Sequence, residues 1–288
     1  MLTIYVQQQK LSINMIRSIQ GKVVAITGGA RGIGYATAQK LIAQGATVAI
    51  GDIDAIRLKQ AGTELGVNTC PTVDVTSIDS FTDFLDEVER SLGPIDVLIN
   101  NAGVMPAGLV VDEDDALTRR MLDINLLGVI TGTKLALRRM QPRGGGHIIN
   151  IASLAGETYF PGFATYCATK YGVLGFSDAA RLESAGTGVA ISSVLPTFTN
   201  TELTSGIGGT KGLKNAEPED IAAAIAKLIL KPKPRVRVTR LAGIAVQAMK
   251  FVPRRAAEAM GHVLGTDQFI TRIDVQQRSA YEQRARGH

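Results

Sequence analysis

Thr27-Gly28-Gly29-Ala30-Arg31-Gly32-Ile33-Gly34 is a glycine-rich turn between the apolar run 23–26 and a stretch with helical spacing. Glycines allow positive φ angles, and without side chains they let backbone amides approach a pyrophosphate at the positive end of a helix dipole. A glycine-rich connection alone is more often just a tight turn, but a strand before it and a helix after it are what dinucleotide binding requires. We therefore predict that the phosphates of a dinucleotide are held by Gly28, Ala30, Arg31, Gly32, Ile33 and Gly34.

The composition indicates one large α/β domain. The chain has 288 residues, of which 45% are hydrophobic, and this is enough for a well-buried core. Its two cysteines lie far apart and its three histidines show no metal-ligand spacing, so we predict no metal site and a reducing compartment. No apolar run reaches the roughly 18 residues of a membrane span, and the first ten residues lack the order of a secretory signal. We expect a cytoplasmic protein, either soluble or peripheral to a membrane.

Basic residues are concentrated in the last part of the chain. The whole chain has a net charge of +5, whereas residues 231–288 contain twelve Lys or Arg and only four Asp or Glu. A basic appendage on a nearly neutral domain does not indicate a nucleic-acid-binding core, and we expect no nucleic acid partner. We divide the chain into an N-terminal extension (1–20), a dinucleotide-binding and catalytic domain (21–240) and a basic helical C-terminal extension (241–288).

Apolar runs alternate with stretches of helical periodicity between residues 21 and 240. The predicted strands are 23–26, 46–50, 69–75, 95–100, 147–152, 189–195 and 235–239. Helices are predicted at 35–44, 78–92, 121–140 and 217–230, with a bend in the third near Gly128 or Gly132. The acidic group 112–115 is interpreted as a helix start that Asp112 caps. This alternation predicts a doubly wound parallel sheet, a Rossmann fold of about seven strands.

Asp52 stands at the end of the second predicted strand, 18 residues after Gly34. A carboxylate at this point, with the adjacent Ile53, would hold the adenosine ribose and repel a 2′-phosphate, which favours NAD over NADP. Arg31 and Arg57 could instead reach a 2′-phosphate, and a solvated strand-end Asp is the alternative without function. The ends of the next strands offer an adenine contact and small residues that leave room for the cofactor: Asp74, Asn101, Ala102 and Gly103.

A serine, a tyrosine and a lysine are predicted to meet at the same sheet edge. Ser153 follows a buried strand, and Tyr166 and Lys170 share a helix face at i and i+4. When a hydride leaves an alcohol carbon, the hydroxyl proton must leave too, and Tyr166 would be the base. A working pKa near 7 asks for about 4 kcal/mol of phenolate stabilisation, which an ammonium about 4 Å away can supply. Ser153 would donate to the substrate oxygen, Lys170 could also bind the nicotinamide ribose, and Asn125 could extend a proton relay through water. An ordinary amphipathic helix is the alternative for Tyr166 and Lys170.

Together these motifs resemble the short-chain dehydrogenase/reductase family over about residues 20–240. The resemblance rests on the glycine turn, Asn100-Asn101-Ala102-Gly103, Asn125, Ser153 and Tyr166-xxx-Lys170. It implies a catalytic tetrad of Asn125, Ser153, Tyr166 and Lys170, in which Tyr166 and Lys170 also contact the cofactor. It further implies adenine contacts by Asp74 and Val75, hydride transfer without a metal, and a homodimer or homotetramer.

One loop departs from the family pattern. The family often has Pro-Gly after its sixth strand and then a Thr that bonds the nicotinamide amide, whereas this chain has Pro196-Thr197-Phe198-Thr199-Asn200-Thr201. We assign Pro196, Thr199 and Thr201 to the cofactor, and the amide contact stays open between the two threonines.

The tail and the apolar residues near the site suggest the substrate. Side chains at 241, 244, 245, 248, 251 and 252 fall on helical spacing among basic residues. Such a helix could lie on an anionic membrane, cover the substrate mouth or pack on a second subunit. Packing within the protein, without any of these roles, is the alternative that we favour. The tail resembles the ends of family members that act on hydrophobic alcohols, including hydroxysteroid and retinol dehydrogenases. Apolar residues near the site favour a hydrophobic secondary alcohol or ketone: Val104, Met105, Leu154, Tyr159, Phe160, Phe163 and Phe198. The alternative is a catalytically silent NAD-binding sensor or scaffold that uses its basic tail to reach a membrane or a partner.

Overall fold

A six-stranded parallel sheet forms the centre of the computed structural model, which describes residues 18–207, 215–249, 251–253, 255–256, 259 and 273–287. The strand order is β2-β1-β3-β4-β5-β6, and every neighbouring pair is parallel. The strands are β1 Val23–Thr27, β2 Thr47–Gly51, β3 Val97–Asn100, β4 Gly146–Ile151, β5 Val189–Pro196 and β6 Arg235–Val238. This confirms the predicted doubly wound α/β fold.

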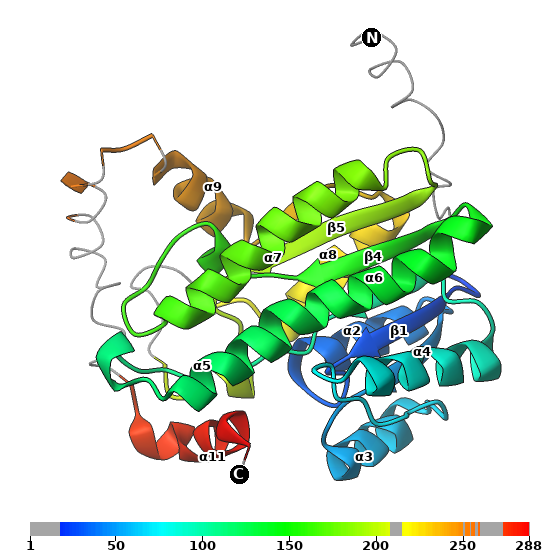
Figure 1. The fold of residues 1–288 in the computed structure, drawn as a ribbon, viewed down its shortest axis with the longest axis horizontal. Coiled ribbons are helices and arrows are strands. Elements are labelled where there is room, and N and C mark those ends of the chain that lie inside the picture. Colours follow the sequence, from blue (N-terminus) through cyan, green and yellow to red (C-terminus); the bar gives the residue numbers. More distant parts are fainter. Residues whose placement is uncertain are drawn as a thin grey trace, which may run out of the picture.

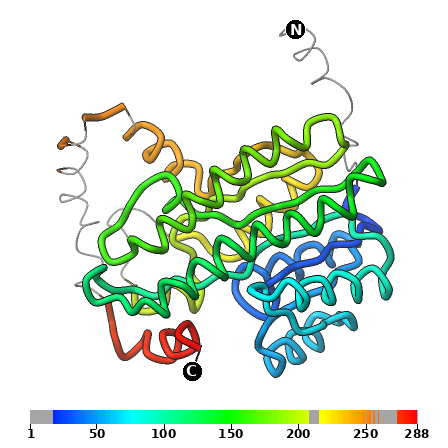
Figure 2. Tube along the Cα trace, in the orientation of Figure 1, coloured from blue at the N-terminus to red at the C-terminus, as the bar shows by residue number. Residues whose placement is uncertain are grey.

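Helices cover both faces of the sheet (Figures 1 and 2). On one face lie α2 Gly32–Ile42 and α8 Pro218–Leu230, and on the other α4 Ile78–Leu92, α6 Gly128–Met140 and α7 Ala164–Glu183. Successive side chains of β1 point to opposite faces, so Val24 and Ile26 join the core under α2 and α8. Val23 and Ala25 join the core under α4 and α6. Burial on both faces explains why these strands are continuous apolar runs.

The strand order places a crevice between β1 and β3. From β1 the chain passes outward to β2, and it then returns to place β3 on the other side of β1. At such a switch point the connections leave in opposite directions and open a space beyond the carboxyl ends of the strands. The glycine turn follows β1, and residues 101–103 follow β3. Both motifs therefore border this space.

The predicted strand at 69–75 is wrong, which reduces the expected seven strands to six. Its backbone bonds to β2 are the Ile50 amide to the Thr69 carbonyl (3.3 Å) and the Val73 amide to the Asp52 carbonyl (3.1 Å). The pairing amounts to one isolated bridge, between Asp52 and Thr72. Pro71 has no N–H to donate, so a regular ladder is interrupted at this point.

The long helix predicted to start at the acidic group and to continue through 121–140 is divided into two α-helices joined by a π-helix. Asp114, and not Asp112, caps α5 Asp115–Leu122 by accepting a hydrogen bond from the Ala116 amide (2.8 Å). The predicted break or bend near Gly128 or Gly132 corresponds to a π-helix over Asp123–Leu127, which ends directly before Gly128. This wider turn carries Asn125 and leads into α6. π-Helical turns of this kind are frequent at functional sites.

Two helices of the tail are described. α9 Arg240–Met249 follows β6, and α11 Val275–Arg286 lies beside α5 (Figure 1). Beneath α9, the buried Glu157 carboxylate accepts hydrogen bonds from Arg235 (2.8 Å), Arg237 (2.6 and 2.7 Å) and Gln247 (2.7 Å). The apolar face predicted for the tail is not buried: its residues at 241, 244, 245, 248 and 251 are exposed, and the residue at 252 is partly exposed.

The remaining elements complete the described part of the chain. α3 Ala55–Leu65 follows β2. Most of the predicted N-terminal extension and the basic residues Lys250 and Arg254 lie outside the described residues. Within the described ranges, every helix is too short or too polar to cross a bilayer.

Candidate active site

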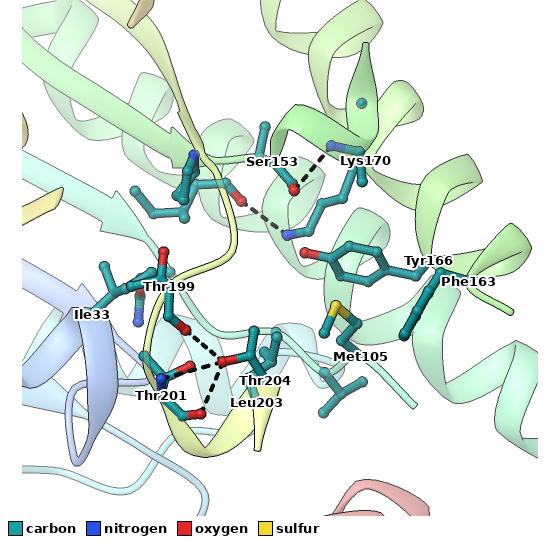
Figure 3. Close-up of a pocket in the computed structure, with 18 of the residues that line it drawn as sticks. Ile33, Met105, Ser153, Phe163, Tyr166, Lys170, Thr199, Thr201, Leu203 and Thr204 are labelled. Atoms are coloured by element: carbon teal, nitrogen blue, oxygen red, sulfur yellow. Dashed lines mark hydrogen bonds between the residues drawn. The ribbon is translucent and has the colours of Figure 1, made fainter. Parts of the chain in front are cut away.

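A cavity of about 1110 Å³ lies at the carboxyl ends of the strands and receives most of the predicted site residues. Its lining includes Gly28, Arg31, Gly32, Ile33, Asp52, Ile53, Asp74, Val75, Asn101, Ala102, Gly103, Ser153, Tyr166, Lys170, Pro196, Thr199 and Thr201. Ala30, Gly34 and Asn125 are not on its wall. Figure 3 shows Ile33, Thr199 and Thr201 on one side, and Ser153, Tyr166 and Lys170 on the other. The predicted cofactor and catalytic residues thus share one space.

At Gly28 and Gly34 the glycine turn is packed so closely that there is no room for a side chain. A Cβ at Gly34 would lie 2.2 Å from the Gly28 carbonyl oxygen. Gly28 has a φ of +65°, and a Cβ there would lie 2.9 Å from the Cα of Ala102. No side chain caps the start of α2, so its first amides have no side-chain acceptor. This cradle fits a dinucleotide pyrophosphate.

Thr27 and Asn101 hold the turn against the end of β3. The Thr27 hydroxyl accepts hydrogen bonds from the amides of Asn101 (3.1 Å) and Ala102 (3.2 Å). In return, the Asn101 side-chain amide donates to the carbonyls of Thr27 (3.0 Å) and Gly28 (2.9 Å). The Asn101 side chain is therefore committed to the turn. Thr27, which the sequence analysis did not assign, is the residue that joins the two motifs.

Asp52 is held in place at the cavity wall. Its carboxylate accepts hydrogen bonds from the amides of Ala30 (3.2 Å) and Asp54 (3.1 Å). Ala30 therefore acts by orienting Asp52. The two arginines that could have received a 2′-phosphate are both paired with carboxylates. Arg31 binds Asp54 (2.5 Å) and Glu202 (3.2 Å), whereas Arg57 binds Glu64 (2.9 Å).

The remaining predicted cofactor residues are positioned by local hydrogen bonds. The Asp74 carboxylate accepts from the amide (2.9 Å) and the hydroxyl (2.7 Å) of Thr76. In the loop after β5, the Thr204 hydroxyl donates to the carbonyls of Thr199 (2.5 Å) and Thr201 (3.1 Å), as Figure 3 shows. The Thr199 hydroxyl donates to the Thr197 carbonyl (2.9 Å). Thr204 thus shapes the loop, although the sequence analysis did not assign it.

Tyr166 and Lys170 lie side by side on α7 and are both buried. The Lys170 Nζ is 5.6 Å from the centre of the Tyr166 ring and donates to the Ile151 carbonyl (3.0 Å). Burial lowers the pKa of Lys170 from 10.5 to about 8. Burial also raises the pKa of Tyr166 above 10, while a hydrogen bond with Ser153 acts in the opposite direction. The expected lowering of the Tyr166 pKa is therefore not seen, because lost hydration disfavours the phenolate more than the Ser153 hydrogen bond favours it.

Asn125 is fully buried in the π-helix, and its side chain is already paired. Its amide oxygen accepts from the Val104 amide (2.8 Å), and its amide nitrogen donates to the Val104 carbonyl (2.8 Å). A longer contact joins the nitrogen to the Thr169 hydroxyl (3.4 Å). The side chain thus ties the loop after β3 to the base of α7, and its predicted relay role stays a prediction.

The substrate end of the cavity is mainly apolar and is closed by the tail. All seven apolar residues expected near the substrate line the cavity. Tyr281, Arg284 and Ala285 of α11 also line it. The sequence analysis included a tail that covers the substrate mouth, but it assigned no α11 residue to the site. No motif marks these residues, because only long-range contacts bring α11 to the cavity.

Comparison with known proteins adds a second line of evidence. A model of the short chain dehydrogenase family matches residues 22–211. The chain is 35% identical over 230 residues to an uncharacterized oxidoreductase of Staphylococcus saprophyticus, which covers 76% of this chain and 94% of that one. It is 33% identical over 217 residues to carbonyl reductase family member 4 of Xenopus tropicalis, with coverage of 73% and 92%. It is 30% identical over 258 residues to 17-beta-hydroxysteroid dehydrogenase 13 of Rattus norvegicus, with coverage of 86% and 84%. β6, α9 and α11 lie outside the segment that the family model matches.

Proposed function

The chain belongs to the short-chain dehydrogenase/reductase family, and we propose that it transfers a hydride between NAD(H) and a hydrophobic secondary alcohol or ketone. Family membership makes it an NAD(P)-dependent oxidoreductase. Family membership does not determine the preference for NAD, the substrate or the roles of single residues, and these are what we propose. The observation that carries it is the single cavity shared by Ser153, Tyr166 and Lys170, the glycine turn and Asp52.

The site residues have complementary tasks in this proposal. Ser153 donates a hydrogen bond to the substrate oxygen in place of its hydrogen bond with Tyr166, so that both hydroxyls face the same reacting group. Tyr166 removes the hydroxyl proton in oxidation and returns it in reduction. Lys170 adds positive charge beside the phenol. When bound, the nicotinamide ring accepts or donates the hydride and, in its oxidised form, brings a further positive charge.

Two features support NAD over NADP. The Asp52 carboxylate stands at the cavity wall, where it would accept hydrogen bonds from ribose hydroxyls and repel a phosphate. The nearby cations are already neutralised, Arg31 by Asp54 and Glu202 and Arg57 by Glu64. A 2′-phosphate would have to compete with these carboxylates.

Cofactor titration tests this preference. NADH and NADPH are titrated into the purified protein and into Asp52→Ala, with nicotinamide fluorescence as the readout. We expect tighter binding of NADH than of NADPH in the parent and a smaller difference in the variant. Equal or tighter NADPH binding by the parent would contradict the preference.

Turnover separates the enzyme from a silent NAD-binding sensor. Secondary alcohols are screened with NAD and ketones with NADH, following absorbance of the reduced cofactor. Tyr166→Phe is expected to lose roughly 100-fold or more in turnover, the contribution of a positioned acid or base, and to keep NADH binding. Unchanged turnover in Tyr166→Phe would refute the assigned base, and no turnover with any substrate would favour the sensor.

The contacts of the tail and the oligomer remain proposals. Leu241, Ile244 and Phe251 are exposed, and Arg240 and Arg255 lie near them in sequence. This arrangement supports either a peripheral contact with an anionic membrane or a subunit contact. Flotation with anionic vesicles tests the membrane contact, and sedimentation velocity tests the homodimer or homotetramer.

A further inference from the structure

α11 is fastened to the loops that surround the substrate end of the cavity. Arg278 is 1% exposed and donates to the carbonyls of Leu203 (2.9 Å), Ser205 (3.1 Å) and Met105. Its Nε also donates to the carboxylate of Glu282 (2.6 Å). One buried guanidinium therefore connects α11 to both the loop after β3 and the loop after β5.

Two further bonds hold α11 from its other sides. The Glu282 carboxylate accepts from the Ala107 amide (3.2 Å), and Arg120 of α5 donates to the Ala285 carbonyl (2.8 Å). Figure 1 shows α11, in red, lying beside α5. Because three segments hold it, α11 forms a fixed wall of the cavity.

Tyr281 brings a hydroxyl into this wall. Its oxygen accepts a hydrogen bond from the Met105 amide (2.6 Å), and its ring lies 4.7 Å from the Arg278 guanidinium carbon. Within the part of the chain that the structure describes, no group accepts the proton of this hydroxyl. Burial raises the pKa of Tyr281 to about 12, so the proton stays on the oxygen at any working pH.

The surroundings of Tyr281 are otherwise apolar on the substrate side. Met105, Phe163 and Leu203 line the same cavity and pack in one apolar cluster with Tyr166. Tyr281 and Tyr166 are close enough for the charge of one to affect the other. Arg284, the charged residue of α11 at the cavity, is paired with Glu202 (2.7 Å). A ligand in this space thus meets an apolar wall that carries one hydroxyl donor held in place by a backbone amide.

Resting on the proposed function, we propose that Tyr281 recognises the substrate by donating a hydrogen bond to a second oxygen, away from the reacting carbon. The substrate is then a hydrophobic ketone or secondary alcohol that carries an additional carbonyl or ester oxygen. A substrate without this oxygen leaves a half-buried donor without that partner, and the lost hydrogen bond is a basis for discrimination.

Competitive inhibition by matched alcohols tests this without requiring that the compared compounds themselves be converted. The test compounds are hydroxy esters with one, two or three carbons between the hydroxyl-bearing carbon and the ester carbonyl carbon. Each is compared with a branched alcohol in which a methyl group replaces the ester carbonyl oxygen. Inhibition constants are measured with NADH against one common ketone. At one spacing, we expect the hydroxy ester to bind about 3- to 10-fold more tightly than its matched alcohol, the effect of one net hydrogen bond.

Variants then assign the preference to Tyr281. In Tyr281→Phe the preference for the hydroxy ester should disappear, whereas any effect of losing the Met105 amide bond should weaken both inhibitors alike. Tyr159→Phe is the matched control, because Tyr159 lines the same cavity but is 56% exposed, and it should keep the preference.

Two results would overturn the inference. The first is that the parent protein binds the hydroxy ester no more tightly than the matched alcohol at any spacing. This result requires no variant, so it counts even if Tyr281→Phe fails to fold. The other is a preference that survives in Tyr281→Phe. Failure of the proposed function looks different, since the parent would then reduce no ketone at all.

Discussion

Replacement of Lys170 by methionine should stabilise the protein while it removes a group that we propose acts in catalysis. Burial lowers the pKa of Lys170 from 10.5 to about 8, and at about 1.4 kcal/mol per pH unit this drop corresponds to about 3 kcal/mol. Below pH 8 the lysine is charged in both the folded and the unfolded state, so the folded state carries the full penalty. Methionine avoids it but leaves the Ile151 carbonyl without its donor, which costs about 1 kcal/mol. The expected net gain at pH 7 is about 2 kcal/mol.

The pH dependence gives this prediction its sharpest test. As the pH rises from 8 to 10.5, the folded lysine loses its proton while the unfolded lysine keeps it, so the unfolding free energy of the parent rises. The advantage of Lys170→Met should therefore vanish near pH 10. Urea unfolding at pH 7 and pH 10 measures both values, and Lys40→Met, at an exposed position, is the control. A difference between parent and Lys170→Met that is the same at both pH values would refute the reasoning.

Two further substitutions probe packing and charge. Gly34→Ala places a Cβ 2.2 Å from a carbonyl oxygen and should lower the unfolding free energy by about 1–3 kcal/mol and weaken NADH binding. Gly108→Ala, with no atom within 4 Å of the added carbon, should do neither in the same urea and fluorescence titrations. Glu157→Gln removes a carboxylate that is 1% exposed and paired with two arginines, and should cost about 3 kcal/mol in urea unfolding. Glu64→Gln, in an exposed pair, should cost less than about 1 kcal/mol, and equal losses at the two sites would contradict the role of burial.

The sequence predicted those parts of the fold that depend on local patterns. Apolar runs of a parallel sheet are buried on both faces, so β1 and β2 stand out without knowledge of their neighbours. The run at 69–75 was also predicted as a strand, but Pro71 leaves only an isolated bridge to the sheet. A break near Gly128 was predicted, but the π-helical turn around Asn125 that precedes this glycine was not, because the apolar periodicity does not distinguish a wider turn from a bend.

The sequence predicted those parts of the site that come from motifs at the ends of strands. It did not predict the part that reaches the cavity through contacts between distant segments of the chain. Asp52 and Lys170 were placed by their spacing from the glycine turn and from Tyr166, and both line the cavity. Their roles stay predictions. Tyr281 reaches the cavity because Arg278 binds backbone carbonyls that lie 73, 75 and 173 residues away in the sequence, and no periodicity in the sequence indicates such a contact. The pKa of Tyr166 likewise depends on its burial, which spacing does not reveal.

The position of α11 has a consequence for how the molecule assembles during translation. The last strand of the sheet ends at Val238, whereas α11 begins at Val275. At 5–20 residues per second, synthesis of the intervening segment takes roughly 2–7 s. By then the strands of the sheet and the glycine turn have been synthesised, while the cavity still lacks the wall that α11 forms. The nascent chain therefore contains the residues around the glycine turn before those that complete the substrate side.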